Sequence, residues 1–505
     1  METVDKSIIE YLEEYAQIEP DKLFLYSEQW GYTVKDTRDV VYAIACFFGK
    51  KGIRNGEYVA LAGLRTQEAV VVFLALRLIG AVVILCDPHE KIEDYVANTG
   101  VEIKIDHYVD HNATSWTLDG EEFAISARTL NGENYAIRTR SVDGNELIIK
   151  TNFADEDNSD ANTEKSSDIE LLICCDTKAP AVIIFTSGST GVHKGVILSE
   201  FNLVNHMRNF HSVGGNEEGD RAIQMLPIFH IFGLTQIIDG IMHRCPLFFP
   251  KEVTPDYICE CIEKYGFTRF GFVPSFALAM ADAKKRNGYN TDSLKVAVLA
   301  GAYSTRQQFE YIQDTLGMRI VPVYGMSECP GITGAAPDEP ADKRASTVGK
   351  VLPMNEVRIE DDGEITVKGP ALFMGYVGEE RGDQNEFFRT GDLGFIDGDG
   401  FLHITGRKKE IIIRNGNNLS VHELEKKLMS LGFVANAAVV GIPSRKCGEV
   451  PAAMITIKHG SIFHEGALSA IFNKLEMPEV IRVVDSLPTG ASGKVDKLKI
   501  KEMLS

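Results

Sequence analysis

A short apolar strand that runs directly into a loop of small residues constrains this chain more than any other feature. Residues Ile184 to Gly195 read IFTSGSTGVHKG, and seven of the ten residues from Thr186 onward are Gly, Ser or Thr. The apolar segment 181–185 before the loop is typical of a buried strand. This arrangement places backbone N–H groups, hydroxyls and the ammonium of Lys194 around one anion, most simply a polyphosphate.

The residues that flank Lys194 separate this loop from its nearest alternative. A Walker A loop has Gly directly before its Lys and Ser or Thr directly after it. Here His193 precedes Lys194 and Gly195 follows it, which argues against a P-loop NTPase. A plain Gly/Ser turn between two strands is also disfavoured, because linkers rarely follow so apolar a strand directly.

Length, composition and charge limit the classes of protein. With 505 residues, the chain is expected to form about two to four domains. Its 44% hydrophobic and 25% charged residues are typical of a soluble globular enzyme. A net charge of −20 argues against nucleic acid or an anionic membrane surface as a general partner. A phosphate ligand would therefore need local cations or a metal.

The apolar stretch at 69–86 is interrupted and does not favour a membrane span. Its length would permit one, but Arg77 and Gly80 interrupt it. We expect a buried helix from Gln67 to about Ile79, stopped by Gly80, and then a strand. The amino-terminal METVDKSIIEYLEEY predicts an acidic amphipathic helix rather than a signal peptide. Because the apolar stretch is interrupted, no transmembrane segment is expected. Nine cysteines without zinc spacing indicate free thiols in a reducing cytoplasm, so a cytoplasmic location is expected.

Alternating strands and helices predict an α/β fold in two domains. Residues 1–405 form the larger domain, with mixed sheets, helices and, at 349–400, a barrel-like antiparallel region. Residues 406–505 form a small α+β domain. The segment 107–151 alternates apolar and polar residues as antiparallel strands do, and the acidic, Ser/Asn-rich 153–168 predicts a surface loop.

Six motifs, in order between about Leu76 and Lys494, resemble those of the adenylate-forming superfamily of acyl- and aryl-CoA synthetases, peptide-synthetase adenylation domains and luciferases. The loop resembles the family's phosphate signature, with His193 where Pro is usual. The other five are MLPIFHIFG (225–233), VYGMSECPG (323–331), RTGDLGFID (389–397), GRKKEIIIRNGNNLSVHELE (406–425) and PTGASGKVDK (488–497). The chain looks closest to free-standing acyl-CoA synthetases.

The resemblance implies a role for each matching residue. The nucleotide would be bound by Thr186, Ser187, Gly188, Ser189, Thr190, Gly191, Lys194, Tyr324, Gly325, Ser327, Asp392 and Arg407. Within that set, Tyr324 would stack on adenine, and Asp392 would accept hydrogen bonds from the ribose. Glu328 would hold Mg²⁺, which prefers carboxylate and phosphate oxygens. Lys494 and His230 would be catalytic, with Lys494 bridging the carboxylate and the α-phosphate.

The family also implies a two-step reaction. A carboxylate attacks the α-phosphorus of Mg-ATP, pyrophosphate leaves, and a thiol then displaces AMP from the acyl-adenylate. The small domain is expected to rotate on a hinge at Lys409 between the steps, presenting Lys494 first and the Gly416 loop second. Coenzyme A is the favoured thiol, and ligation to the phosphopantetheine of a separate carrier protein is the alternative.

The sequence does not identify the carboxylic acid. Candidate pocket residues are His230, Gly301, Ala302 and Tyr303, together with Phe272, Pro274 and Gly325. The ring of Tyr303, which follows two small residues, could shorten the pocket. A non-catalytic relative is disfavoured, because Glu328, Asp392 and Lys494 are intact. A monomer or homodimer is expected.

Overall fold

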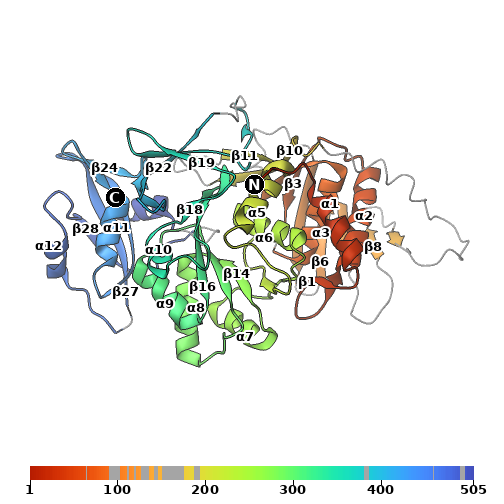
Figure 1. Cartoon of the computed structure of the whole chain (residues 1–505), viewed down its shortest axis with the longest axis horizontal. Helices are drawn as coiled ribbons and strands as arrows, with labels where there is room; N and C mark the ends of the chain where they lie inside the picture. Colours follow the sequence, from red (N-terminus) through yellow and green to blue (C-terminus); the bar gives the residue numbers. More distant parts are fainter. Residues whose placement is uncertain are drawn as a thin grey trace, which may run out of the picture.

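The computed structural model describes residues 1–63, 65–89, 103–110, 113–118, 121–126, 136–140, 146–150, 176–186, 194–379, 386–458, 460–489 and 495–505. Most of the chain forms an α/β body, and the residues after Ile411 form a smaller unit at the opposite end from the amino-terminal helices (Figure 1). The predicted α/β class and small carboxy-terminal α+β unit are therefore confirmed.

Two large sheets form the body. The ten-stranded sheet has the order β21 (Gly375–Tyr376), β11 (Lys194–Ser199), β10 (Pro180–Thr186), β4 (Val82–Cys86), β3 (Tyr58–Ala62), β5 (Ile103–Asp110), β6 (Ala113–Leu118), β7 (Glu121–Ser126), β8 (Ala136–Arg140) and β9 (Glu146–Lys150). The nine-stranded sheet has the order β18 (Lys350–Val351), β17 (Cys329–Gly334), β16 (Arg319–Met326), β15 (Val296–Leu299), β14 (Arg269–Phe272), β12 (Ala222–Ile223), β13 (Leu247–Phe248), β1 (Leu23–Tyr26) and β2 (Gly31–Thr33).

Helices cover these sheets, and several lie between them. The helices of the body are α1 (Ile8–Ile18), α2 (Val34–Lys50), α3 (Gln67–Ile79), α5 (Glu200–His211), α6 (Ile231–Met242), α7 (Pro255–Tyr265), α8 (Pro274–Asn287), α9 (Arg306–Leu316) and α10 (Ala341–Ser346). One buried hydrophobic cluster includes residues of α1, α2, α3, α5 and α6 and of strands in both sheets. Figure 1 shows α5 and α6 near the middle of the molecule. These two helices therefore contribute to a hydrophobic core that both sheets share.

The interrupted apolar stretch folds as expected. Helix α3 ends at Ile79, and Gly80 caps it in the left-handed conformation with φ 85° before β4 begins. Arg77 is buried and pairs with buried Glu200 of α5 at 2.7 Å, which neutralises a charge that has no access to water. Among the described residues, no helix is long and apolar enough to cross a membrane.

Antiparallel strands form where the sequence predicted them. Strands β5 to β9 pair antiparallel in succession, which confirms the prediction for 107–151 over its described residues. The predicted loop at 153–168 lies outside the described residues. The region 349–400 contributes most of a four-stranded antiparallel sheet in the order β19 (Glu356–Ile359), β20 (Glu364–Lys368), β22 (Phe388–Ile396) and β23 (Leu402–Arg407).

The carboxy-terminal unit follows a turn at Lys408–Glu410. Its five-stranded sheet contains β25 (Asn417–Ser420), β24 (Ile411–Arg414), β27 (Gly448–Ile457), β26 (Val434–Ser444) and β28 (Val480–Val483). Its helices are α11 (Val421–Met429), α12 (Leu468–Ile471) and α13 (Lys497–Leu504). The predicted boundary between residues 405 and 406 falls inside β23, and the position of the boundary stays a prediction.

Candidate active site

The ends of the predicted phosphate loop are held together by a hairpin. Strand β10 ends at Thr186, β11 begins at Lys194, and these two residues are register partners. Gly195 must lack a side chain, because a Cβ there would lie 2.8 Å from Val377. Ser187, Gly188, Ser189, Thr190, Gly191 and His193 lie outside the described residues, so their roles stay predictions.

Lys194 leaves this hairpin beside an aromatic ring and a carboxylate. Its Nζ lies 4.4 Å from the centre of the Tyr376 ring and 3.2 Å from Oε1 of Glu379. Tyr376 comes from β21, which pairs with β11 so that Val196 is its register partner. The ring and carboxylate hold the ammonium at the loop end of the hairpin, where an anion would bind.

Tyr376 also contacts Glu328. Its hydroxyl donates a hydrogen bond of 2.7 Å to Oε1 of Glu328, and the backbone N–H of Phe373 donates to the Glu328 carbonyl at 2.8 Å. Burial and the neighbouring Glu328 raise the pKa of Tyr376, so its hydroxyl remains a donor at neutral pH. One tyrosine therefore contacts both the predicted metal ligand and the predicted phosphate lysine, which lie far apart in the sequence.

Glu328 offers a carboxylate suited to Mg²⁺ but no complete protein cage. It is buried, in the turn between β16 and β17. The described residues contain no group of three His, Cys, Asp or Glu that could hold a metal ion. Mg²⁺ is usually bound by one or two carboxylates together with substrate phosphates and water. Glu328 therefore fits a magnesium ion that arrives with a polyphosphate.

Asp392 joins Tyr324 to Arg407. The Tyr324 hydroxyl donates to Oδ2 of Asp392 at 2.7 Å, and Nε of Arg407 donates to Oδ1 at 2.8 Å. Asp392 on β22 and Arg407 on β23 are register partners, so the sheet itself sets this pair. Burial and the Asp392 carboxylate raise the pKa of Tyr324. Each carboxylate oxygen has a second acceptor position, so Asp392 retains capacity for ligand hydroxyls.

We refer to Lys194, Tyr324, Glu328, Tyr376, Asp392 and Arg407 together as the charged cluster. These six residues come from β11, β16, β21, β22 and β23 and from the β16–β17 turn. Sequence motifs predicted five of these residues, and reasoning from sequence missed Tyr376. The Gly-Tyr pair at 375–376 gives no indication of a contact with Glu328, which is 48 residues away.

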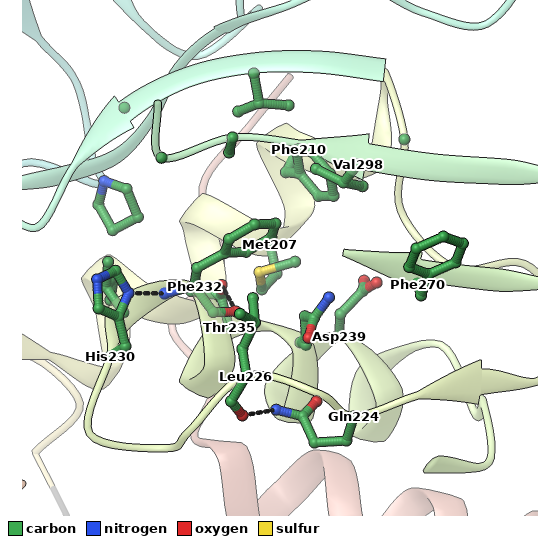
Figure 2. A pocket seen from close by; sticks show the side chains of 18 of the residues that line it. Met207, Phe210, Gln224, Leu226, His230, Phe232, Thr235, Asp239, Phe270 and Val298 are labelled. Carbon is green, nitrogen blue, oxygen red and sulfur yellow. Dashed lines mark hydrogen bonds between the residues drawn. The ribbon is translucent and has the colours of Figure 1, made fainter. Parts of the chain in front are cut away.

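A cavity opens beside the charged cluster, and we call it the α5–α6 cavity. It is lined by residues of α5 and α6 and of strands β12 to β16, and it has a volume of about 120 Å³. Figure 2 shows His230 at one end and Asp239 and Phe270 toward the other. Gly325 and Ser327, which lie between Tyr324 and Glu328, also line it. The cavity and the charged cluster therefore share one segment of chain.

His230 stands at the start of α6. Its Nδ1 accepts a hydrogen bond of 3.4 Å from the backbone N–H of Phe232, as an N-cap does. A neutral ring held in this way carries its proton on Nε2. His230 lines the cavity, so its side chain lies where the sequence predicted a pocket residue.

The other predicted pocket residues divide into two groups. Gly301 and Gly325 line the α5–α6 cavity, whereas Ala302, Tyr303, Phe272 and Pro274 are not among its lining residues. The Tyr303 ring is 45% exposed and lies edge-to-face with His422 of α11 at 4.4 Å. Tyr303 thus contacts the carboxy-terminal unit, and its predicted effect on pocket length has no support from this arrangement.

Of the predicted catalytic lysine and the predicted hinge residue, the structure describes only the second. Lys494 lies outside the described residues. Lys409 lies in the turn that leaves β23 for β24, where the N–H of Glu410 donates to the carbonyl of Arg407 at 3.0 Å. Ser420 also donates to the carbonyl of Thr405 at 3.1 Å across this turn. The roles of Lys409 and Lys494 stay predictions.

Comparison with known proteins agrees with this geometry. The family model described as AMP-binding enzyme matches residues 12–377, and that of the AMP-binding enzyme C-terminal domain matches residues 423–494. The chain is 26% identical to the 2-succinylbenzoate–CoA ligase of Listeria innocua, over 97% of this chain and 98% of the relative.

Solved structures share the fold over nearly the whole chain. The o-succinylbenzoate CoA synthetase (MenE) of Bacillus subtilis, in complex with its acyl-adenylate intermediate, matches with a TM-score of 0.75 and 22% identity, covering 97% of each chain. The same Bacillus enzyme in complex with ATP and magnesium ion matches with a TM-score of 0.73 and 22% identity, covering 98% of each chain.

Proposed function

Because the chain belongs to the AMP-binding enzyme family, we propose a role for each part of its site in an AMP-forming acid–CoA ligase. This enzyme adenylates a carboxylic acid with Mg-ATP, releases pyrophosphate, and transfers the acyl group to coenzyme A. The assignment rests mainly on segment 324–328, which belongs to both the charged cluster and the α5–α6 cavity. Tyr324 and Glu328 belong to the charged cluster, and the residues between them line the α5–α6 cavity.

The charged cluster binds ATP in this proposal. Asp392 accepts hydrogen bonds from the ribose hydroxyls, with Arg407 and the Tyr324 hydroxyl keeping its carboxylate in place. Lys194 and the loop residues that precede it hold the β- and γ-phosphates. Glu328 would hold Mg²⁺, which neutralises phosphate charge when bound.

The α5–α6 cavity holds the body of the acid, with its carboxylate at the end near His230 and Gly325. A carboxylate and an α-phosphate repel each other, so the main task of the protein is to position them and to neutralise the growing charge. Lys494 is proposed to contact both anions. The new bond joins a carboxylate oxygen to the α-phosphorus, and the bond to pyrophosphate breaks.

The second step needs a different arrangement of the carboxy-terminal unit. We propose that this unit turns at Lys409 and brings the Gly416 loop toward the acyl-adenylate. Asn415 and Gly416 have φ of 51° and 77° in the turn between β24 and β25, so the loop is a tight hairpin. The thiol of coenzyme A then attacks the acyl carbon, and AMP leaves.

We also propose a cytoplasmic location and a monomer or homodimer. All seven cysteines in the described part of the chain are free thiols, which favours a reducing compartment. Cell fractionation and light scattering of the purified protein test these two proposals.

Pyrophosphate release is the direct test of the activity. We expect release that depends on Mg-ATP and on an added carboxylic acid, together with formation of an acyl-CoA when coenzyme A is present. The Lys494→Ala variant is expected to lose about 100- to 1,000-fold in the adenylation rate, as enzymes do when one transition-state contact is removed. No pyrophosphate with any acid would contradict the proposal.

A further inference from the structure

The wall of the α5–α6 cavity contains polar side chains that no adenylation motif explains. Gln224, Gln236 and His206 line the cavity, and Gln224 and His206 are buried. Oε1 of each glutamine and Nδ1 of His206 have no hydrogen-bond partner. A buried polar atom without a partner costs about 1–3 kcal/mol. Three residues with such atoms line one cavity, and rotation of their side chains would turn these atoms toward a ligand that completes their hydrogen bonds.

The two glutamines present acceptors. The amide nitrogen of Gln224 donates to the carbonyls of Leu226 at 2.7 Å and Gly233 at 3.1 Å, which leaves its oxygen as the unpaired atom (Figure 2). The amide nitrogen of Gln236 packs against β14, because a Cβ on Gly271 would lie 2.1 Å from it. A matching ligand group must therefore be a hydrogen-bond donor.

The charged side chains of the same wall already have partners. Asp239 accepts from Nδ1 of His243 at 2.7 Å and from the N–H of Asn216 at 3.0 Å. Arg269 pairs with Asp220 and donates to the carbonyls of Gly214 and Gly215. Burial lowers the pKa of His206 to about 4, so this ring is neutral at pH 7. The wall thus offers no unpaired charge to a second carboxylate or to an ammonium group.

The cavity volume limits the size of the ligand. At about 120 Å³, the α5–α6 cavity is somewhat smaller than the apolar cavity of about 150 Å³ that binds benzene in another protein. A single six-membered ring is therefore about the size of body that this volume accommodates. Most of the remaining lining is apolar, including Met207, Phe210 and Val298, which suits the faces of a ring.

We propose that the acid is about one ring in size and carries a neutral hydrogen-bond donor, either a hydroxyl that donates to Gln236 or Gln224 or an aryl amine that can donate to both. This inference rests on the proposed function, since it concerns the acid that the ligase activates. It differs from 2-succinylbenzoate, after which the Listeria relative is named, because that acid has two carboxylates and this wall holds no free cation for the second.

A matched set of acids tests the inference. The set contains benzoate, the three hydroxybenzoates, the three aminobenzoates, isophthalate, terephthalate and octanoate, each assayed by pyrophosphate release with Mg-ATP. We expect at least one hydroxy or amino isomer to exceed benzoate about tenfold or more in kcat/KM, because a missing donor leaves buried acceptors unpaired. The two dicarboxylates and octanoate are expected to fall below benzoate.

Variants connect that preference to the glutamines. In Gln236→Leu, the ratio of kcat/KM for the best isomer to that for benzoate is expected to fall below about threefold. Gly271→Ala, whose Cβ would displace the Gln236 amide and crowd the Phe232 ring, should lower the same ratio. Met207→Leu is the control, because it alters an apolar part of the wall and should keep the ratio.

Each outcome separates the inference from the proposed function. A best substrate among benzoate, the dicarboxylates or octanoate, or a ratio that survives in Gln236→Leu and Gly271→Ala, would overturn the inference and leave the ligase activity standing. Pyrophosphate release with an acid of another size, and with none of this set, would overturn it as well. The absence of pyrophosphate with every acid would instead defeat the proposed function.

Discussion

The charged cluster and the α5–α6 cavity meet at residues 324–328, yet they present different polar groups to a ligand. In the charged cluster, Glu328 and Asp392 are held by tyrosine hydroxyls, and Lys194 and Arg407 each pair with a carboxylate. In the cavity, Asp239 pairs with His243 and Arg269 pairs with Asp220, and the unpaired oxygens of Gln224 and Gln236 are neutral. The charged cluster suits a ligand of high charge. The α5–α6 cavity suits an acid that is recognised by size and by hydrogen bonds.

This contrast predicts that changes in the charged cluster affect all acids alike, whereas changes in the cavity alter the ranking of acids. The largest effect is expected for Glu328→Ala. Loss of the carboxylate proposed to hold Mg²⁺ should lower kcat/KM for adenylation about 100- to 1,000-fold, since phosphate charge is then poorly neutralised. The measurement is pyrophosphate release over a range of Mg²⁺ concentrations. A loss that differs between acids by more than about threefold would break the contrast.

Lys409→Pro tests whether the two steps need different positions of the carboxy-terminal unit. Proline fixes φ and should restrict rotation in this turn. Thioester formation is expected to fall about 100-fold, with adenylation largely retained, in single-turnover assays of each half-reaction. Lys408→Ala is the neighbouring control, because it removes a side chain without restricting the backbone. Equal loss of both half-reactions would contradict the hinge.

Asp392→Asn should have an intermediate effect, which is confined to the binding of ATP. The substitution weakens charge-assisted hydrogen bonds, which contribute about 1.5–3 kcal/mol each. We expect KM for ATP to rise about 10- to 100-fold and KM for the acid to stay within about twofold. Because Asp392 is buried beside Arg407, the thermal midpoint of the variant is measured first, to separate binding from unfolding. A matching rise in both KM values would mean that the charged cluster and the α5–α6 cavity do not act independently.

Tyr376→Phe should have the smallest effect and the most specific one. It removes the hydroxyl that donates to Glu328 and keeps the ring beside Lys194. The Mg²⁺ concentration for half-maximal rate is expected to rise about three- to tenfold, as expected for one hydrogen bond to a charged group. Tyr376→Leu removes the ring as well and should also raise KM for ATP. An unchanged Mg²⁺ requirement in both variants would show that Tyr376 does not position Glu328.

Sequence could predict the charged cluster far better than the cavity, for a physical reason. Residues that bind phosphates, ribose and metal lie in contiguous motifs, because loops at strand ends present several ligand groups together. Strand ends and helix caps also followed local rules, as at Gly80 and at Thr305, which caps α9. Contacts such as Tyr376 with Glu328 depend on how β21 packs, and no local rule reports that.

The cavity is assembled from side chains of separate helices and strands. Gln224, Gln236 and His206 each look like ordinary core-flanking residues when taken alone. One signal was available in α5, where Asn202, His206 and Asn209 recur at helical spacing and are all buried. Polar residues on a buried helix face require partners. That pattern indicates buried polar contacts, but Asn202 and Asn209 make theirs outside the cavity, and only the fold places His206 on its wall.

The most direct test of this account is one competition experiment. Wild-type and Gln236→Leu enzymes are given Mg-ATP, coenzyme A and an equimolar mixture of benzoate and the best hydroxy or amino isomer, and the two acyl-CoA products are measured by mass spectrometry. We predict that the wild type forms the substituted product in at least about tenfold excess, and that the excess falls below about threefold in the variant. Equal excess in both enzymes, or an excess of benzoyl-CoA in the wild type, would contradict the division between a charged wall for the nucleotide and a neutral, hydrogen-bonding wall for the acid.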